Sequence, residues 1–116
     1  MELKEFKEEV KIFRDERNWN QFHNPLDLSV AMSIECAEIL ELIRFKSREE
    51  VQTWISNPEN KKEFSYEMAD VFIFLLALAN STGIDLEQAF KEKLIINKEK
   101  YPIDKCHSKK DKYDKF

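Results

Sequence analysis

The feature that most constrains this fold is the spacing of its apolar residues, which recur three and four positions apart along most of the chain. Such spacing places side chains on one stripe of a helix. The first stripe is formed by Leu3, Phe6, Val10 and Phe13. The chain also has only one glycine and three prolines in 116 residues, which is too few for a turn-rich β fold. The sequence therefore predicts an all-α protein.

About five helices are predicted. The first begins near Leu3 and ends before residues 18–20, and the others cover about residues 28–45, 47–56, 61–81 and 85–100. Residues with short polar side chains, or glycine, stand where these helices should begin or end. Ser47 is followed three residues later by a glutamate, as in a capping box. The expected caps are Asp27, Ser47, Gly83 and Asp85.

Two segments are more apolar than a surface helix requires. The helix near residues 28–45 is apolar around more than half of its circumference, and residues 71–79 are apolar on every side. We expect both segments to be mostly buried. A chain of this length suits one core, so one domain is predicted for residues 1–104, followed by a mobile charged tail over residues 105–116.

The charge balance bears on possible partners. The chain has 19 basic and 23 acidic residues and a net charge of −4, which disfavours binding to polymeric nucleic acid. A small phosphorylated ligand remains possible if a basic cluster or bridging metal ions offset the acidic charge.

The cysteines and the longest apolar run bear on location. Cys36 and Cys106 form neither a disulfide framework nor a metal clip, which favours a reducing, cytoplasmic setting. The apolar run 71–79 is far shorter than the roughly 20 residues that span a bilayer, and the N-terminus does not resemble a signal peptide. We therefore expect a soluble protein with no membrane partner.

Two pairs of acidic residues occupy helices that otherwise look buried. Glu35 and Glu38 are three residues apart, as are Glu67 and Asp70, so each pair shares one helical face. A single pair is most simply explained by a solvated helix edge or by salt bridges with lysines. Two pairs on packed helices are harder to explain in that way, because an unpaired buried carboxylate is costly. Four converging carboxylates would suit Mg²⁺, which prefers oxygen ligands.

Zinc is a poorer candidate for this site. His23 and His107 are the only histidines, and neither is paired with a cysteine at ligand spacing. A carboxylate-bound metal with open positions polarises a phosphate and activates water, and this chemistry requires a phosphoanhydride substrate.

Other residues could complete a nucleotide site. Lys93, Asn97 and Lys100 share a polar helical face that could hold phosphate, although such spacing alone is more typical of a solvated lysine face. Phe45 and Phe74 follow Glu38 and Asp70 by seven and four residues, so each could line a base pocket or belong to the core. An aromatic-rich connector adds three more rings, those of Trp19, Phe22 and His23.

Four motifs together resemble the MazG-like all-α nucleoside triphosphate pyrophosphohydrolases, and most of all their dCTP pyrophosphatase branch. The resemblance covers about residues 5–102. The motifs are Glu-Arg-Asn-Trp-Asn-Gln-Phe-His-Asn-Pro at 16–25, Glu-x-x-Glu-Ile-x-Glu-Leu at 35–42, Glu-Met-Ala-Asp-Val at 67–71, and the lysine, asparagine, lysine, tyrosine and proline at 93, 97, 100, 101 and 102.

The resemblance implies hydrolysis between the α and β phosphates of a nucleoside triphosphate. It also implies a four-helix core that assembles as a homodimer or homotetramer. The metal ligands for Mg²⁺ would be Glu35, Glu38, Glu67 and Asp70, with Glu38 also acting on the attacking water. The substrate would be bound by Trp19, His23, Phe45, Phe74, Lys93, Asn97, Lys100 and Tyr101.

The chain departs from the dCTP-preferring pattern at three positions. Phe45 stands where a tryptophan is expected, and Leu26 and Asp27 stand where a basic residue and an asparagine are expected. The substrate predicted from the resemblance is therefore a nucleoside triphosphate such as dCTP or a modified pyrimidine analogue, with the choice of base open. Two alternatives also stay open: a helical interaction module whose carboxylates form salt bridges, and a phosphohydrolase that removes the γ-phosphate instead.

Overall fold

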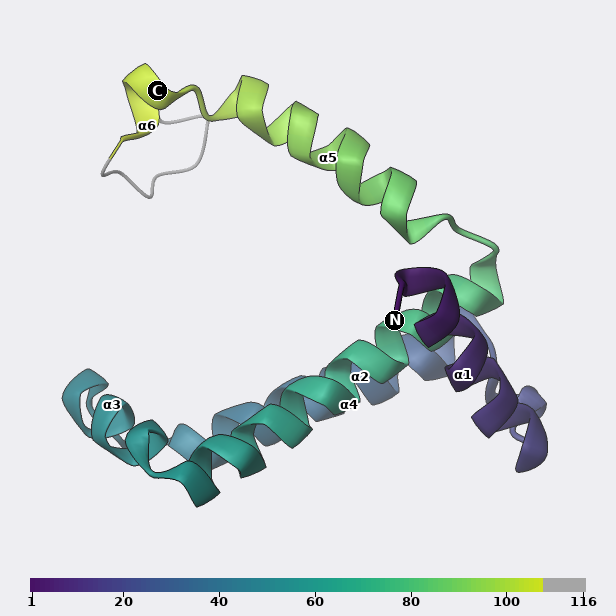
Figure 1. Ribbon diagram of the computed structural model, residues 1–116, viewed down its shortest axis with the longest axis horizontal. Helices are drawn as coiled ribbons and strands as arrows, with labels where there is room; N and C mark the ends of the chain where they lie inside the picture. The colour runs from purple at the N-terminus through teal and green to yellow at the C-terminus, as the bar shows by residue number, and fades with distance from the viewer. Residues whose placement is uncertain (108–116) are drawn as a thin grey trace. The chain divides into compact units, whose positions relative to one another are not determined.

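The computed structural model describes residues 1–107, which divide after Gly83 into two units whose relative positions are not determined (Figure 1). Within the described residues there are helices and no strands, so the predicted all-α class is confirmed. The first unit contains α1 (Leu3–Glu16), the 3₁₀ turn η1 (Asn20–Phe22), α2 (Pro25–Ile43), α3 (Arg48–Ser56) and α4 (Pro58–Thr82). The second unit contains α5 (Leu86–Lys100) and α6 (Ile103–Cys106).

Three of the predicted helix caps are confirmed. The Ser47 hydroxyl accepts a hydrogen bond from the Glu50 N–H at 3.1 Å, and the Asp85 carboxylate accepts one from the Gln88 N–H at 3.0 Å. Gly83 ends α4 with a φ of +69°, in the left-handed region that favours glycine. These caps could be predicted because each depends on contacts within a few residues.

The predicted starts of two helices are wrong by about one turn. Asn24 caps α2, and its side-chain oxygen accepts a hydrogen bond from the N–H of Asp27, which is therefore not the cap. Asn57 caps α4 in the same way. In both helices a proline, Pro25 or Pro58, is the first helical residue, because that position needs no N–H donor and favours the φ of proline. We had expected these prolines to precede the helices.

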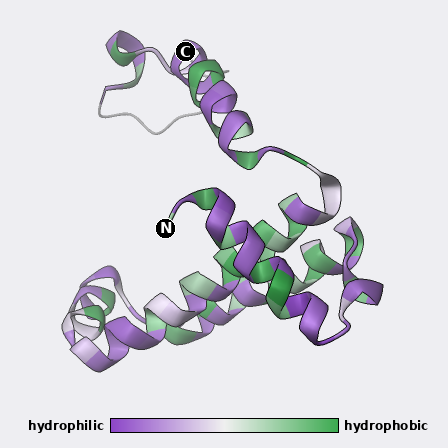
Figure 2. Cartoon of the chain, turned by 45° about the vertical axis from the view of Figure 1, so that its right-hand side comes forward, coloured by the Kyte–Doolittle hydropathy of each residue, from purple (hydrophilic) through white to green (hydrophobic). Residues whose placement is uncertain are grey.

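The core of the first unit lies where α1, α2 and α4 meet. Its buried members are Val10, Leu28, Leu76 and Ala77. The Asn80 side chain also donates a hydrogen bond to the Lys7 carbonyl at 3.0 Å, which fastens α4 to α1. Figure 2 shows hydrophobic residues on these helices where they approach one another. α2 and α4 form the most extensive pairing, side by side and joined through α3 (Figure 1).

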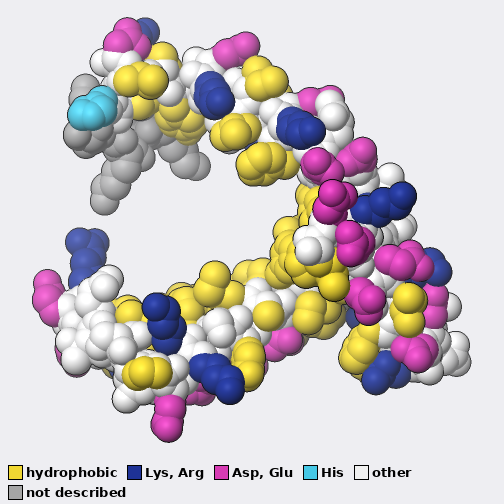
Figure 3. All heavy atoms as spheres, in the orientation of Figure 1, with side chains coloured by type: hydrophobic (Ala, Val, Ile, Leu, Met, Phe, Trp, Pro, Cys, Tyr) yellow, Lys and Arg dark blue, Asp and Glu magenta, His cyan; other side chains and the backbone are white. Residues whose placement is uncertain are grey.

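The prediction that α2 is mostly buried is wrong for the single chain. Leu28 is its only buried residue, whereas Val30, Ile34 and Leu40 are more than half exposed. Figure 3 shows hydrophobic side chains on the surface of the α2 and α4 region. Periodicity reveals how much of a helix is apolar, but a helix that packs mainly on one neighbour buries only one face. The prediction of burial agrees better with the second half of α4, where Leu76, Ala77 and Ala79 are buried.

α4 is long and apolar enough to cross a membrane by length and composition alone. The core helix of a soluble protein meets the same criterion. The absence of a membrane partner therefore stays a prediction.

The C-terminal region contains a helix that was not predicted. α6 places Lys105 and Cys106, the first residues of the predicted tail, in a helical turn. Residues 108–116 of that tail lie outside the described residues, so its mobility stays a prediction, as does the single domain over residues 1–104.

Candidate functional site

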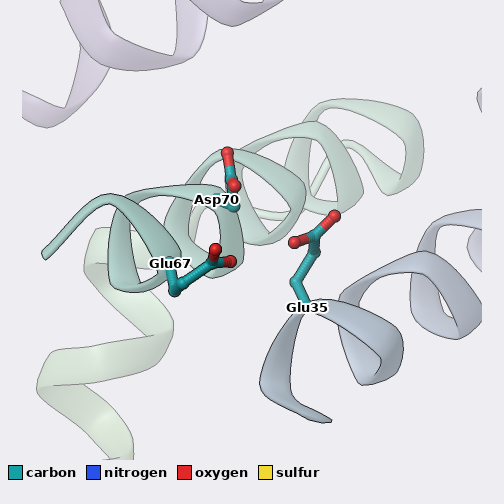
Figure 4. Close-up of side chains that lie close together, drawn as sticks. All are labelled: Glu35, Glu67 and Asp70. Carbon is teal, nitrogen blue, oxygen red and sulfur yellow. The ribbon is translucent and has the colours of Figure 1, made fainter. Parts of the chain in front are cut away.

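Three carboxylates converge between α2 and α4. Glu35 projects from α2, and Glu67 and Asp70 project from the facing side of α4 (Figure 4). One oxygen from each lies within 4.8 Å of the other two. Ligand oxygens on opposite sides of an octahedral Mg²⁺ are roughly 4 Å apart. Small side-chain adjustments would therefore let all three bind one divalent ion.

The charges around this cluster are repulsive. Burial raises the pKa of Glu35, and the negative charges of Asp70, Glu67 and Glu38 raise it further. Burial likewise raises the pKa of Glu67, with added contributions from Asp70, Glu38 and Glu63. A lysine or arginine partner would lower both pKa values instead. The cluster therefore has the electrostatics of a cation site rather than of a salt-bridged surface.

Glu38 differs from the other three predicted metal ligands. It is exposed and does not belong to the converging group, although its charge acts on both Glu35 and Glu67. Asp70 is also exposed, and Glu35 and Glu67 are half-buried. The expectation that all four carboxylates lie among apolar neighbours is therefore too strong, because these helix faces remain partly open to solvent.

Phe45 is not placed on the same helical face as Glu38, contrary to the prediction. α2 ends at Ile43, and Phe45 has a φ of +65°, which turns the chain toward α3. Its side chain is 94% exposed, with the Arg44 guanidinium 5.2 Å from the ring centroid. The helix was predicted two residues too long because Phe45 fits the apolar pattern of α2.

The other three predicted base-pocket residues gather around one side chain, that of Arg14. Its guanidinium carbon lies 5.5 Å from the Trp19 ring centroid and 6.0 Å from that of Phe74. Arg14 and His23 both line a cavity of about 340 Å³, together with Lys11, Asp15, Asn20 and Asn80. The structure thus brings Trp19, His23 and Phe74 into one region of the first unit.

Sequence reasoning missed Arg14, because the apolar stripe of α1 continues from Val10 to Phe13 in the sequence and not to Arg14. Arg14 lies four residues after Val10 and is buried like it, whereas Phe6 and Phe13 are 39% and 44% exposed. The buried side of α1 therefore includes Val10 and the charged residue Arg14. A charge at an inward position of an amphipathic helix is unusual enough to be singled out.

The predicted phosphate-binding residues belong to the second unit. Lys93, Asn97 and Lys100 lie along α5, and Tyr101 caps its C-terminus, donating its N–H to the Asn97 carbonyl at 2.8 Å. The predicted helical spacing of the first three is confirmed. The position of α5 relative to the acidic cluster is not determined, so its contact with substrate stays a prediction.

Comparisons with known proteins agree on one family. The sequence model of the MazG-like family matches residues 30–116. Human dCTP pyrophosphatase 1 is 37% identical over 103 residues, covering 87% of this chain and 59% of the human protein. The mouse protein of the same name is 37% identical over 91 residues, covering 78% of this chain and 54% of its own length. The chain thus spans little more than half the length of these relatives.

A solved structure supports the same conclusion. The crystal structure of a pyrophosphatase from Archaeoglobus fulgidus matches with a TM-score of 0.79 and 37% sequence identity. The match covers 85% of this chain and 91% of the archaeal chain.

Proposed function

Because this chain belongs to the MazG-like family, we propose that it is a nucleoside triphosphate pyrophosphohydrolase that depends on Mg²⁺. The reaction hydrolyses a deoxynucleoside triphosphate, dCTP or a modified pyrimidine analogue, to the monophosphate and pyrophosphate. The observation that carries the proposal is the convergence of Glu35, Glu67 and Asp70. Their negative charges repel one another, and a bound cation would offset this repulsion. The names of the dCTP pyrophosphatase relatives support the choice of substrate.

The four acidic residues have two different proposed roles. Glu35, Glu67 and Asp70 would hold the metal through their carboxylate oxygens, which are the ligands that Mg²⁺ prefers. When bound there, a divalent ion polarises a phosphate oxygen and lowers the pKa of a coordinated water. Glu38 lies beside the cluster without converging on it, so its carboxylate is available to accept a proton from the attacking water.

The remaining parts of the proposal concern the substrate and the assembly. Trp19, His23 and Phe74 would surround the base, and Phe45 would provide a further ring. The triphosphate would contact Lys93, Asn97, Lys100 and Tyr101. A homodimer or homotetramer would cover the exposed apolar face of α2 and complete a four-helix core. Cys36 and Cys106 are free thiols, in keeping with a cytoplasmic enzyme.

The non-catalytic alternative requires salt-bridged carboxylates. For Glu35 and Glu67 it is disfavoured, because burial and then the neighbouring negative charges raise both pKa values, whereas a salt bridge would lower them. We therefore retain the enzyme as the conclusion.

Product analysis tests this function. Purified protein incubated with each dNTP and Mg²⁺ is expected to release pyrophosphate and the monophosphate, and to release neither in EDTA. Ion-exchange chromatography separates pyrophosphate from orthophosphate. Orthophosphate with a diphosphate product would indicate cleavage of the γ-phosphate and would contradict the proposal, as would no release from any dNTP or rNTP.

A further inference from the structure

Arg14 is a buried cation that has no role in the metal chemistry or the substrate contacts proposed above. Its side chain is 6% exposed, and its Nε is closed to solvent and has no hydrogen-bond partner among residues 1–107. Asp15, the carboxylate next to it in the sequence, pairs with Lys11 at 2.9 Å instead. Because the Nε is closed to solvent, it is not a group that a ligand contacts directly.

Packing alone does not explain an arginine at this position. Burial lowers the pKa of Arg14, because the charged form is disfavoured away from water. The guanidinium nevertheless stays charged at pH 7. A methionine or leucine would fill a similar volume without the cost of burying a charge. The neighbours of the guanidinium therefore have to explain why a cation lies here.

These neighbours are two aromatic rings from different elements. Trp19 lies at the start of η1, and Phe74 lies on α4. The guanidinium carbon of Arg14 is 5.5 Å from the Trp19 ring centroid and 6.0 Å from that of Phe74. Ring faces attract cations, more strongly away from water, and a planar guanidinium suits this contact better than an ammonium. Arg14, on α1, thus joins the connector to α4 through these two rings.

The other contacts of Trp19 fix its ring less firmly. The Phe13 ring meets it edge-on at 5.7 Å, but Phe13 is itself 44% exposed. The Trp19 N–H donates to the Arg14 carbonyl at 3.1 Å, which fixes the backbone and not the ring. A cavity of about 340 Å³ borders the connector at Asn20 and His23, so the connector is not closely packed on that side. The Arg14 guanidinium is therefore the buried contact that holds the Trp19 ring.

We propose that Arg14 is a positioning residue, which holds the rings of Trp19 and Phe74 in place for a nucleotide base without touching the substrate. The proposal rests on the proposed function, which assigns both rings to the base pocket. Trp19 is 39% exposed, so part of its ring is open to a ligand while Arg14 stays buried. Side chains that are held in place before binding lose less freedom when the substrate binds. Arg14 should therefore affect substrate affinity rather than the chemical step.

Arg14→Met tests this role by steady-state kinetics at saturating Mg²⁺, with the dNTP that the wild-type protein hydrolyses fastest. Methionine keeps an aliphatic side chain but removes the charge and the planar group. We expect KM to rise roughly threefold to thirtyfold, the loss that corresponds to a buried cation–π contact. The value of kcat should stay within about twofold of wild type, as it does when a binding interaction common to ground and transition states is removed. Mn²⁺ affinity should be unchanged, because the acidic cluster is intact.

The fluorescence of Trp19 tests the same role without any nucleotide. A Trp54→Phe background removes the only other tryptophan. In Arg14→Met, quenching of Trp19 by acrylamide should rise roughly twofold, as the ring moves from 39% exposure toward the exposure of a free side chain. Arg14→Lys keeps the charge but replaces the planar group by a hydrated ammonium, so both readouts should move in the same direction. The lysine variant serves if the methionine variant does not fold.

Arg17→Met is the matched control. Arg17 is exposed near the same end of α1 and lies over the Phe13 ring at 3.7 Å, so the control removes a cation–π contact that does not involve Trp19. KM and the quenching of Trp19 should both keep their wild-type values. Equal changes in Arg17→Met and Arg14→Met would overturn the proposal.

The two readouts separate this proposal from the proposed function. If the wild-type protein releases no pyrophosphate from any nucleotide, the proposed function fails, and the quenching of Trp19 still decides whether Arg14 holds the ring. Unchanged quenching in a folded Arg14 variant would overturn the proposal whatever the outcome for hydrolysis. In an active enzyme, stronger quenching with an unchanged KM would also overturn it, because the ring would then have moved without affecting the substrate.

Discussion

Asp70→Asn is expected to lower the rate of pyrophosphate release by roughly a hundredfold to a thousandfold. The substitution keeps the shape of the side chain but removes one of three anionic ligands from the cluster with Glu35 and Glu67. A bound metal contributes several kcal/mol of transition-state stabilisation, and each 1.36 kcal/mol corresponds to a factor of about ten. Initial rates at saturating Mg²⁺ and dNTP measure the effect.

Glu41→Gln is the control for this experiment. Glu41 lies on α2, six residues after Glu35, and pairs with Arg44 at 3.4 Å on the surface. Removing its charge should change the rate by less than about twofold, because an exposed pair contributes little. Full turnover by Asp70→Asn, or an equal loss in Glu41→Gln, would contradict the role assigned to the cluster.

Leu76→Ala is expected to lower the free energy of unfolding by about 2–5 kcal/mol, the usual cost of truncating a fully buried leucine. Leu76 is 1% exposed and packs with Leu28 and Val10 where α4, α2 and α1 meet. Truncation would leave a cavity at the point that holds α2 against α4, and this pairing positions the acidic residues. Urea unfolding followed by circular dichroism measures the loss.

Leu26→Ala provides the comparison for Leu76. Leu26 is 72% exposed in the first turn of α2, so its truncation should cost less than about 0.5 kcal/mol. Equal losses in the two variants would show that the described core does not stabilise the fold.

The helices could be predicted because their signals are local. Apolar spacing and caps such as Ser47 and Gly83 depend on residues within one or two turns. The predicted starts of α2 and α4 are about three residues too late, because Pro25 and Pro58 are the first residues of these helices.

Burial could not be predicted in the same way, because it depends on which elements pack together. Val30 and Leu40 fit the apolar pattern of α2 but are exposed in this chain. Arg14 shows the opposite failure, since a lone arginine on an amphipathic helix is usually solvated but here is buried.

The candidate site could be predicted in part. The spacing of Glu67 and Asp70 places them on one face of α4. The prediction that the helix bearing Glu35 packs against the helix bearing Glu67 and Asp70 agrees with the structure. Helical spacing could not show that Glu38 lies outside the converging group, because Glu67 and Asp70 have the same three-residue spacing and do converge. The place of α5 in the site could not be derived from spacing either, since spacing describes one helix and not its neighbours.

The central claim is that Glu35, Glu67 and Asp70 bind a divalent cation. Electron paramagnetic resonance with Mn²⁺ tests it directly, because the six-line signal of free aqueous Mn²⁺ weakens when the ion binds protein. The account predicts that wild-type protein removes this signal, that Mg²⁺ restores it by competition, and that Glu67→Gln weakens Mn²⁺ binding by at least about tenfold. An undiminished Mn²⁺ signal with excess wild-type protein, or unchanged affinity in Glu67→Gln, would contradict the account.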